Sequence, residues 1–275
     1  LVGDTTSIML GGAANMNFVD FIFMDGKPGI FWAVELGALA TVPVIMFFFR
    51  KERGRVTVGE PAKVEDYVPS VLLLGTVVLL IAASFIPERP ALTNGFICMG
   101  VFVIGMIYTL VCKKKAELVK NALTEIDFQT LLLLAGLFIV IGSLTYNGII
   151  DDISQLLVNL GGSNLFLMYT LIVWASVLFS AFIDNIPYVA TMLPVVAGIA
   201  SRMGCAPHLL YFGLLVGATL GGNLTPIGAS ANIAAIGILR KAGYEVKTKE
   251  FLRIGVPFTL LAVLVGYLFC WFIWS

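Results

Sequence analysis

Residues 206–239 read APHLLYFGLLVGATLGGNLTPIGASANIAAIGIL, and this stretch decides the fold. It holds no Asp, Glu, Lys or Arg, but it is much longer than the about 20 residues that cross a hydrocarbon core. Gly-Gly-Asn-Leu-Thr-Pro at 221–226 interrupts it. Because proline donates no backbone hydrogen bond and glycine weakens a helix, the pattern predicts two half-helices joined by unwound backbone. At membrane depth such backbone persists only where protein or a wet cavity satisfies it.

The composition agrees with a membrane location. The chain of 275 residues is 59% hydrophobic and 12% charged, whereas soluble domains carry about 25% charged residues. The predicted fold class is an all-α polytopic membrane protein. The zero net charge gives no reason to expect nucleic-acid binding. Runs long enough to span a bilayer lie at 30–49 (with Glu35 inside), 67–86, 94–112, 128–145, 165–183 and 254–274.

A second segment resembles the break. Residues 3–8 read GDTTSI and residues 222–227 read GNLTPI, which share a Gly-[Asp/Asn]-x-Thr-[Ser/Pro]-Ile pattern. Polar, helix-breaking segments at matching places in two halves of a membrane protein indicate a transport site. The candidate residues of the first copy are Gly3, Asp4, Thr5 and Thr6.

The lysines and arginines predict the sidedness of the loops. Basic clusters place 50–66, 113–127 and 240–253 in the cytoplasm, and the acidic loop 15–29 outside. The two copies then point in opposite directions, as in inverted-repeat transporters. The C-terminus is expected outside, at the plasma (inner) membrane.

The predicted organisation follows from this repeat. Residues 1–66 would be the end of the first repeat, a broken-helix tail plus one span. Residues 67–122 would be connecting spans. Residues 123–275 would be the second repeat, with a re-entrant hairpin near 165–203 and a broken helix at 206–241. About a hundred residues of helices would be expected before the first copy, so we expect an incomplete transporter that lacks most of its first half.

The best candidate for chemistry is the turn at Asp184-Asn185. A long apolar run leads into it, and Pro187 is a good first-turn residue for the next helix. A carboxylate in a membrane is costly and is a functional candidate, although Asp184 could also serve as a helix N-cap. The candidate site here comprises Asp184, Asn185, Pro187 and Thr191.

The break at 221–226 supplies the other half of the candidate site. Its carbonyls and side chains suit a hard cation such as sodium, and the half-helix N-termini after each break suit an anion. The candidate residues are Gly221, Gly222, Asn223, Thr225 and Pro226, with Ser230 and Asn232 in the turns that follow. Sodium, as a coupling ion, could be held by Asp184, Asn185, Gly222, Asn223 and Thr225; no other cofactor is expected.

Other polar residues have simpler interpretations. Glu35 could face a cavity, but we expect it to snorkel near the interface. We expect His208 to sit at a helix start and the four cysteines to act as small apolar side chains. The amphipathic stretch 113–127 is predicted to be a surface helix with a solvated face, not a site.

Residues 180–195 and 221–232 together resemble the ion transporter superfamily, and most of all its NhaD-type sodium/proton antiporters and arsenite-efflux permeases. Those proteins carry an Asp-Asn-[Ile/Val]-Pro element similar to 184–187 and a Gly-Gly-Asn-x-Thr-x-Ile-Gly-Ala-Ser-Ala-Asn element similar to 221–232. Asp127-Phe128 is similar to the opening of their second half. The resemblance, which extends to citrate-transporter-like domains, implies two inverted repeats. In related sodium/dicarboxylate symporters a Ser-Asn-Thr motif stands where this chain has 184–186, which favours proton or sodium exchange here.

The leading hypothesis is therefore a secondary transporter that moves an inorganic ion coupled to protons or sodium, by cation/proton antiport or arsenite-type efflux. A sodium-coupled di- or tricarboxylate symporter, a passive channel and an intramembrane aspartyl protease using Asp4 and Asp184 stay open as alternatives, although we expect no enzyme. The expected partners are the transported ion or organic anion, the lipid bilayer and, as an open alternative, a second copy in a homodimer.

Overall fold

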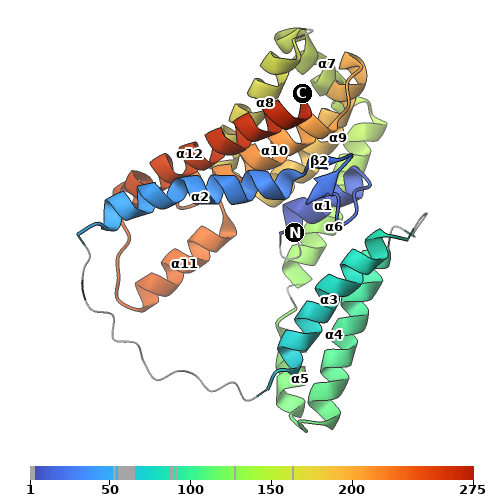
Figure 1. The fold of residues 1–275 in the computed structure, drawn as a ribbon, viewed down its shortest axis with the longest axis vertical. Coiled ribbons are helices and arrows are strands. Elements are labelled where there is room, and N and C mark those ends of the chain that lie inside the picture. The colour runs from blue at the N-terminus through green and yellow to red at the C-terminus, as the bar shows by residue number, and fades with distance from the viewer. Residues whose placement is uncertain are drawn as a thin grey trace.

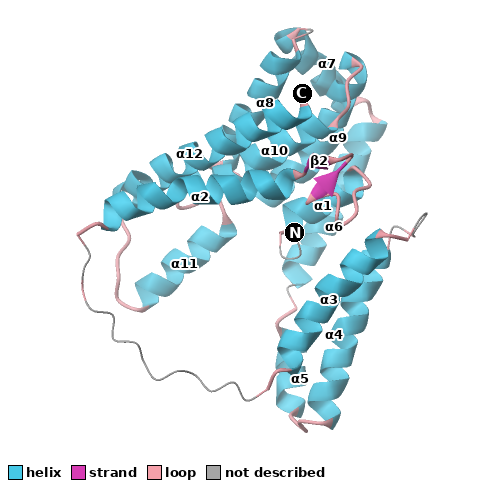
Figure 2. Ribbon diagram, in the orientation of Figure 1, coloured by secondary structure: helices cyan, strands magenta, loops and turns pink. Residues whose placement is uncertain are grey.

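The computed structural model describes residues 4–51, 54, 66–86, 90, 92–126, 128–162 and 164–275. Most of this is helical (Figures 1 and 2), which confirms the all-α fold class. The described strands are β1 (Phe23–Met24) and β2 (Lys27–Pro28), an antiparallel pair. The helices are α1 (Thr5–Ala13), α2 (Ile30–Phe49), α3 (Val68–Ser84), α4 (Thr93–Val111), α5 (Ala116–Thr124), α6 (Phe128–Tyr146), α7 (Ile149–Gly161), α8 (Leu165–Ser180), α9 (Asn185–Met203), α10 (His208–Gly221), the 3-10 turn η1 (Gly222–Leu224), α11 (Ser230–Lys241) and α12 (Thr248–Trp274).

The predicted spans correspond to helices, with two differences. Helix α12 begins six residues before the predicted span, because Lys249, Glu250 and Arg253 extend it at its polar end. Helix α6 continues into α7 across a 72° bend, which the sequence analysis did not anticipate. Gly148, with φ of +75°, makes this bend. In the described residues α2, α4, α9 and α12 are each long and apolar enough to cross a membrane.

Helix α10 lies at the centre of the main helical bundle (Figure 1), where it packs against α8, α9 and α12. It is apolar around its whole circumference, and eleven of its fourteen residues are buried. A helix that is apolar all round lies in a protein core or across a membrane, and the burial of α10 shows that it lies in the core of the bundle. The end of α10 is therefore held firmly where the chain unwinds.

A glycine stripe brings α10 close to α8. Gly213, Gly217 and Gly221 face α8 at intervals of four residues. A Cβ at Gly217 would lie 2.4 Å from the carbonyl oxygen of Val173, and one at Gly221 would lie 2.7 Å from Cα of Val177. Small residues at this spacing let helix backbones approach closely in membranes. The ends of α8 and α10 consequently lie together.

Helices α2 and α12 run antiparallel, side by side (Figure 1). At one end Trp274 Nε1 donates to the carbonyl oxygen of Pro28 over 3.1 Å. At the other end the Arg253 guanidinium lies 5.9 Å from the ring centroid of Phe48. The end of α2 and the beginning of α12 are therefore neighbours.

Helices α3, α4 and α5 form a separate group, joined to the rest mainly through the chain. None of the residues of α4 is buried. Helix α5 confirms the predicted helix in 113–127, although Asp127 itself lies outside the described residues.

Candidate functional site

Asp184 forms the tip between α8 and α9. Helix α8 ends at Ser180, and residues 181–184 turn the chain into α9. Asp184 is the N-cap, and its Oδ1 accepts the backbone N–H of Ile186 over 3.1 Å. The side chain is half-buried, and Oδ2 has no hydrogen bond to the described residues. The carboxylate is thus both a cap and an open acceptor.

The break after α10 is unwound as the sequence predicts. Residues Gly222–Leu224 form a 3-10 turn and Thr225 is extended. The next helix starts at Ser230, three residues later than a start directly after Pro226, because the segment between them curves back toward α8, where Gly228 approaches Ala181. Asn232 Nδ2 donates to the carbonyl oxygens of Gly222 and Thr225, over 3.1 and 3.2 Å. This amide satisfies backbone that the unwinding exposes.

The tip and the break are in direct contact. The buried Thr225 hydroxyl donates to the carbonyl oxygen of Ala181. Ser180 Oγ donates to the carbonyl oxygen of Ala218 over 2.5 Å. A Cβ at Gly228 would lie 2.8 Å from the carbonyl oxygens of both Ala181 and Ser180, so only glycine fits. We call this contact, formed by residues 180–184, Ala218, residues 222–228 and Asn232, the junction.

The first copy also reaches this region. Asp4 caps α1, and its carboxylate accepts from the backbone N–H and hydroxyl groups of Thr6 and Ser7. Thr6 and Thr219 share a hydrogen bond of 3.0 Å between their hydroxyl oxygens. Helix α1 packs against α9 and α10. Unlike the second copy, this one begins a helix at once, at Thr5; Gly3 lies outside the described residues.

A small cavity lies between α1, α2 and α10. Its volume is about 270 Å³, and its polar lining is Asp4, Ser7, Glu35 and Thr219. Glu35 is exposed, so it lies at the edge of this space. Glu35 thus lines the edge of a cavity beside Asp4 and Ser7 of the first copy.

The remaining candidates lie farther apart. Asn223 lines another cavity, of about 370 Å³, together with Glu250 and Phe251. Thr191 donates to the carbonyl oxygen of Pro187 over 2.9 Å, within α9. Ser230 is exposed and Asn185 is half-buried. The junction thus joins Gly222, Thr225 and Asn232 to the turn that leads to Asp184, through the contact of Thr225 with Ala181, while Asn223 lines a different cavity.

Sequence reasoning missed several residues of the junction. Ser180, Ala181, Ala218 and Gly228 contribute carbonyl oxygens, a hydroxyl or a close approach. Thr219 was also missed. A hydroxyl group in an apolar half-helix, just before the break, could have indicated it. Among the described residues no three His, Cys, Asp or Glu side chains gather as a metal site. Any cation here would bind mainly carbonyl, hydroxyl and amide oxygens.

The family profile described as "Citrate transporter" matches residues 1–217. The chain belongs to the citrate transporter family. An uncharacterized transporter of Mycobacterium bovis is 32% identical over 277 residues, which is 98% of this chain and 63% of that protein. The 46 kDa membrane protein of Mycobacterium leprae is 31% identical with the same coverage. The P protein of Homo sapiens is 34% identical over 171 residues, 60% of this chain and 20% of that protein.

Membership of the citrate transporter family, together with the apolar helices, makes this an integral membrane protein of a transporter family. It supports the citrate-transporter-like part of the resemblance and does not distinguish the antiporter and arsenite branch. The chain spans about 63% of the length of the mycobacterial relatives. The profile covers both the tip at Asp184 and the first copy at Asp4.

Proposed function

We propose that the protein is a secondary active transporter that moves a small inorganic ion, coupled to protons or sodium, with its site at the junction. The observation that carries the proposal is the contact between the capped turn at Asp184 and the unwound segment at Thr225. Two helix interruptions that meet are a means of binding an ion near the membrane midplane. A titratable carboxylate at that point supplies a group for coupling.

Each polar group at the junction has a role in this proposal. Asp184 holds a proton or a cation through Oδ2, while Oδ1 stays bound to the N–H of Ile186. The carbonyl oxygens of Gly222 and Thr225, oriented by Asn232, offer ligands of the kind that sodium prefers. In this proposal the ion does not bind directly to the other candidates, which are Asn185, Asn223 and Thr191.

A citrate-like carboxylate is the second candidate substrate. The family profile carries this description. In addition, the N-cap of α11 is Ala229, which has no side chain that could cap the helix, so the first amides of α11 are available to an anion. The N-terminus of a helix binds carboxylates through such amides and through its dipole. The sodium-coupled symporter is thus a distinct alternative, with α11 in the substrate role.

The test is Asp184→Asn in protein reconstituted into liposomes with an imposed proton or sodium gradient. We expect gradient-driven flux to be lost while expression and thermal unfolding stay close to wild type, since asparagine also caps helices well. Asp152→Asn, on the exposed face of α7, is the control and should retain flux. Wild-type coupled flux in Asp184→Asn would remove Asp184 from the mechanism.

The same liposomes separate the two substrates. Inorganic-ion exchange predicts that an imposed sodium gradient moves protons without citrate. Citrate symport predicts that labelled citrate accumulates only with the gradient. If citrate accumulates and ion exchange without citrate is absent, the symporter replaces the first proposal.

A further inference from the structure

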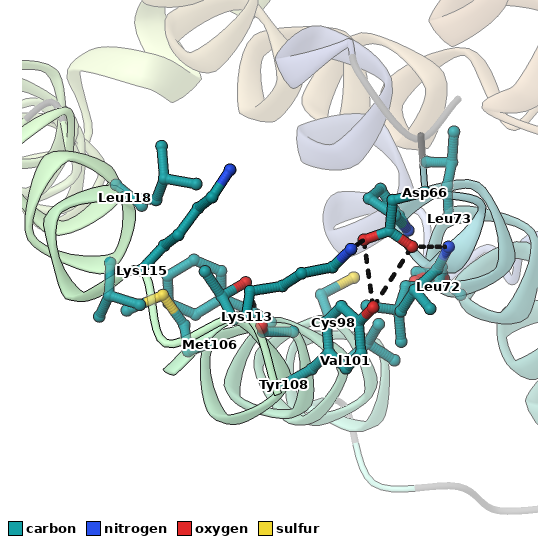
Figure 3. Close-up of a pocket in the computed structure, with 18 residues that line it drawn as sticks. Asp66, Leu72, Leu73, Cys98, Val101, Met106, Tyr108, Lys113, Lys115 and Leu118 are labelled. Carbon is teal, nitrogen blue, oxygen red and sulfur yellow. Dashed lines mark hydrogen bonds and ion pairs between the residues drawn. The ribbon is translucent and has the colours of Figure 1, made fainter. Parts of the chain in front are cut away.

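A pocket separate from the junction lies in the group formed by α3, α4 and α5. A pocket of about 580 Å³ opens between these helices; this is within the range of about 300–1,000 Å³ that is common for small-molecule sites. Its walls are mostly apolar and include Leu72, Val101, Phe102, Met106 and Leu118 (Figure 3). Its polar groups are concentrated at one end.

That polar end is built around an ion pair. Lys113 Nζ lies 3.1 Å from Asp66 Oδ2. The Tyr108 hydroxyl donates to the same carboxylate over 3.1 Å, and the N–H of Val68 donates to Asp66 Oδ1 over 3.0 Å. Because Asp66 precedes α3 and Lys113 follows α4, the pair ties together the same end of two antiparallel helices. The location of this pair at the helix ends shows which end of the pocket lies near the membrane surface.

Helix α4 is 19 residues long, or about 28 Å at 1.5 Å per residue, close to the about 30 Å of a hydrocarbon core. The Asp66–Lys113 end therefore lies at headgroup level when α4 spans the bilayer. The pocket reaches from there to Thr76 and Cys98, two turns or more into the acyl-chain region. An apolar groove with a polar mouth at this depth matches the two parts of a lipid.

The charge at the mouth is positive. Residues 113–120 read KKKAELVK, with four lysines and one glutamate. Lys113 is neutralised by Asp66, but Lys115 lines the pocket and forms no ion pair with the described residues. Figure 3 shows the Lys115 ammonium apart from the Asp66–Lys113 pair, on the side of Leu118 and with no interaction drawn to it. A free ammonium above an apolar groove complements a phosphate that carries an acyl chain.

Helix α5 contributes the remaining wall. Leu118, Val119 and Ala122 face the pocket from one side of α5, and this helix is strongly amphipathic. An amphipathic helix with lysines on its polar side lies in the membrane interface. It would hold the acyl chain against α4 while Lys120, and Lys115 at its N-cap, stay among the headgroups.

The geometry points to a binding site for an anionic phospholipid, with the phosphate on Lys115 and one acyl chain between α3, α4 and α5. The occupant is a lipid of the surrounding bilayer, and the site is separate from the transport route.

The experiment is native mass spectrometry of the delipidated full chain, titrated with phosphatidylglycerol or phosphatidylcholine. We expect phosphatidylglycerol to bind more tightly, and Lys115→Ala to weaken its binding about fivefold, as one lysine contributes at an anionic surface. Lys241→Ala, an exposed lysine at the end of α11, is the matched control and should bind as wild type does.

A second pair of variants tests the groove independently of charge. Val101→Trp fills the pocket and should abolish retained phosphatidylglycerol, whereas Val103→Trp, outside the pocket on the same helix, should not. Equal binding of the two lipids, or equal loss in both tryptophan variants, would overturn the proposal. Complete displacement of phosphatidylglycerol by inorganic phosphate would also overturn it, because the site would then bind a free anion. A dimer without lipid that Val101→Trp dissociates would overturn it too, because a second copy would then fill the pocket.

Discussion

Two aspartates cap helices near the junction, but their carboxylates differ in what they have left to bind. Asp4 accepts four hydrogen bonds, from the backbone and hydroxyl groups of Thr6 and Ser7. Asp184 accepts one, from Ile186. A carboxylate has about four lone-pair sites, so Asp4 is filled by its own helix and Asp184 is not. Of the two, Asp184 is the better acceptor for a proton or a cation.

Sequence reasoning singled out Asp184 because a carboxylate after a long apolar run is a local signal. It could not show that the Asp4 carboxylate is already filled, because this depends on where the hydroxyl groups of Thr6 and Ser7 lie. Gly3, the remaining candidate of the first copy, lies outside the described residues.

In the Asp66–Lys113 pair, the pKa of the acid is lowered and the pKa of the amine is raised, so both lie farther from pH 7. The pKa of Asp66 lies below its ordinary value of 3.8, chiefly because Val68 N–H donates to the carboxylate and then because Lys113 and Tyr108 do. The pKa of Lys113 lies above 10.5, chiefly because of the hydrogen bond to Asp66. The contribution of Asp66 to stability is lost as pH falls through its lowered pKa, and that of Lys113 as pH rises through its raised pKa. The pair therefore persists across the physiological range.

A labelling experiment checks this at Lys113. Only the neutral amine reacts with acetic anhydride, so between about pH 9 and 11 Lys113 should acetylate more slowly than it does in Asp66→Asn, where its partner carries no charge. The measurement is peptide mass spectrometry of acetylation against pH. Identical pH profiles in the two proteins would show that the pair does not form in solution.

At the scale of elements, the glycine stripe on α10 determines where the tip and the break meet. Gly217 lets the α10 backbone approach the carbonyl of Val173 on α8, and the junction lies at the ends of these same helices.

The break itself could be predicted, because glycine and proline act on their own backbone. Its contact with the tip could not, because Thr225 and Ala181 are 44 residues apart and no periodicity links them. The bend at Gly148 was missed for a related reason, since a lone glycine between apolar runs also fits a straight helix.

Gly217→Ala should therefore destabilise the bundle. The added Cβ would overlap the Val173 carbonyl oxygen, and overpacking of this kind costs about 1–3 kcal/mol. Gly237→Ala in α11 is the control, because nothing lies within 4 Å of its Cβ position; alanine there should stabilise by about 0.5–1 kcal/mol. Thermal unfolding in detergent measures both. Equal midpoints in the two variants would mean that α8 and α10 are not in backbone contact.

At the scale of the whole molecule, the antiparallel pairing of α2 and α12 bears on sidedness. Arg253 lies against Phe48 at one end, so the basic segments after α2 and before α12 lie on one side of the bundle. Lys27 and Trp274 meet at the other end, 5.4 Å from the ammonium to the ring centroid. Basic segments on one side and a lysine-poor loop on the other are the pattern of the positive-inside rule. Part of the first basic cluster, Arg53, Arg55 and Lys63, lies outside the described residues.

We propose on this basis that the two copies belong to inverted repeats, and cysteine labelling tests the topology. Cys98, Cys112 and Cys205 are exposed or half-buried and are first replaced by serine. In intact cells an impermeant maleimide should then label Asp25→Cys and Ser275→Cys, because the hairpin at β1–β2 and the end of α12 lie together. Lys114→Cys and Lys241→Cys should react only after the membrane is opened, because their loops carry the lysines and arginines that stay in the cytoplasm.

Labelling of Asp25→Cys and Ser275→Cys from different sides would contradict the packing of α2 on α12. Labelling of all four positions from one side would contradict the inverted repeat while leaving that packing intact.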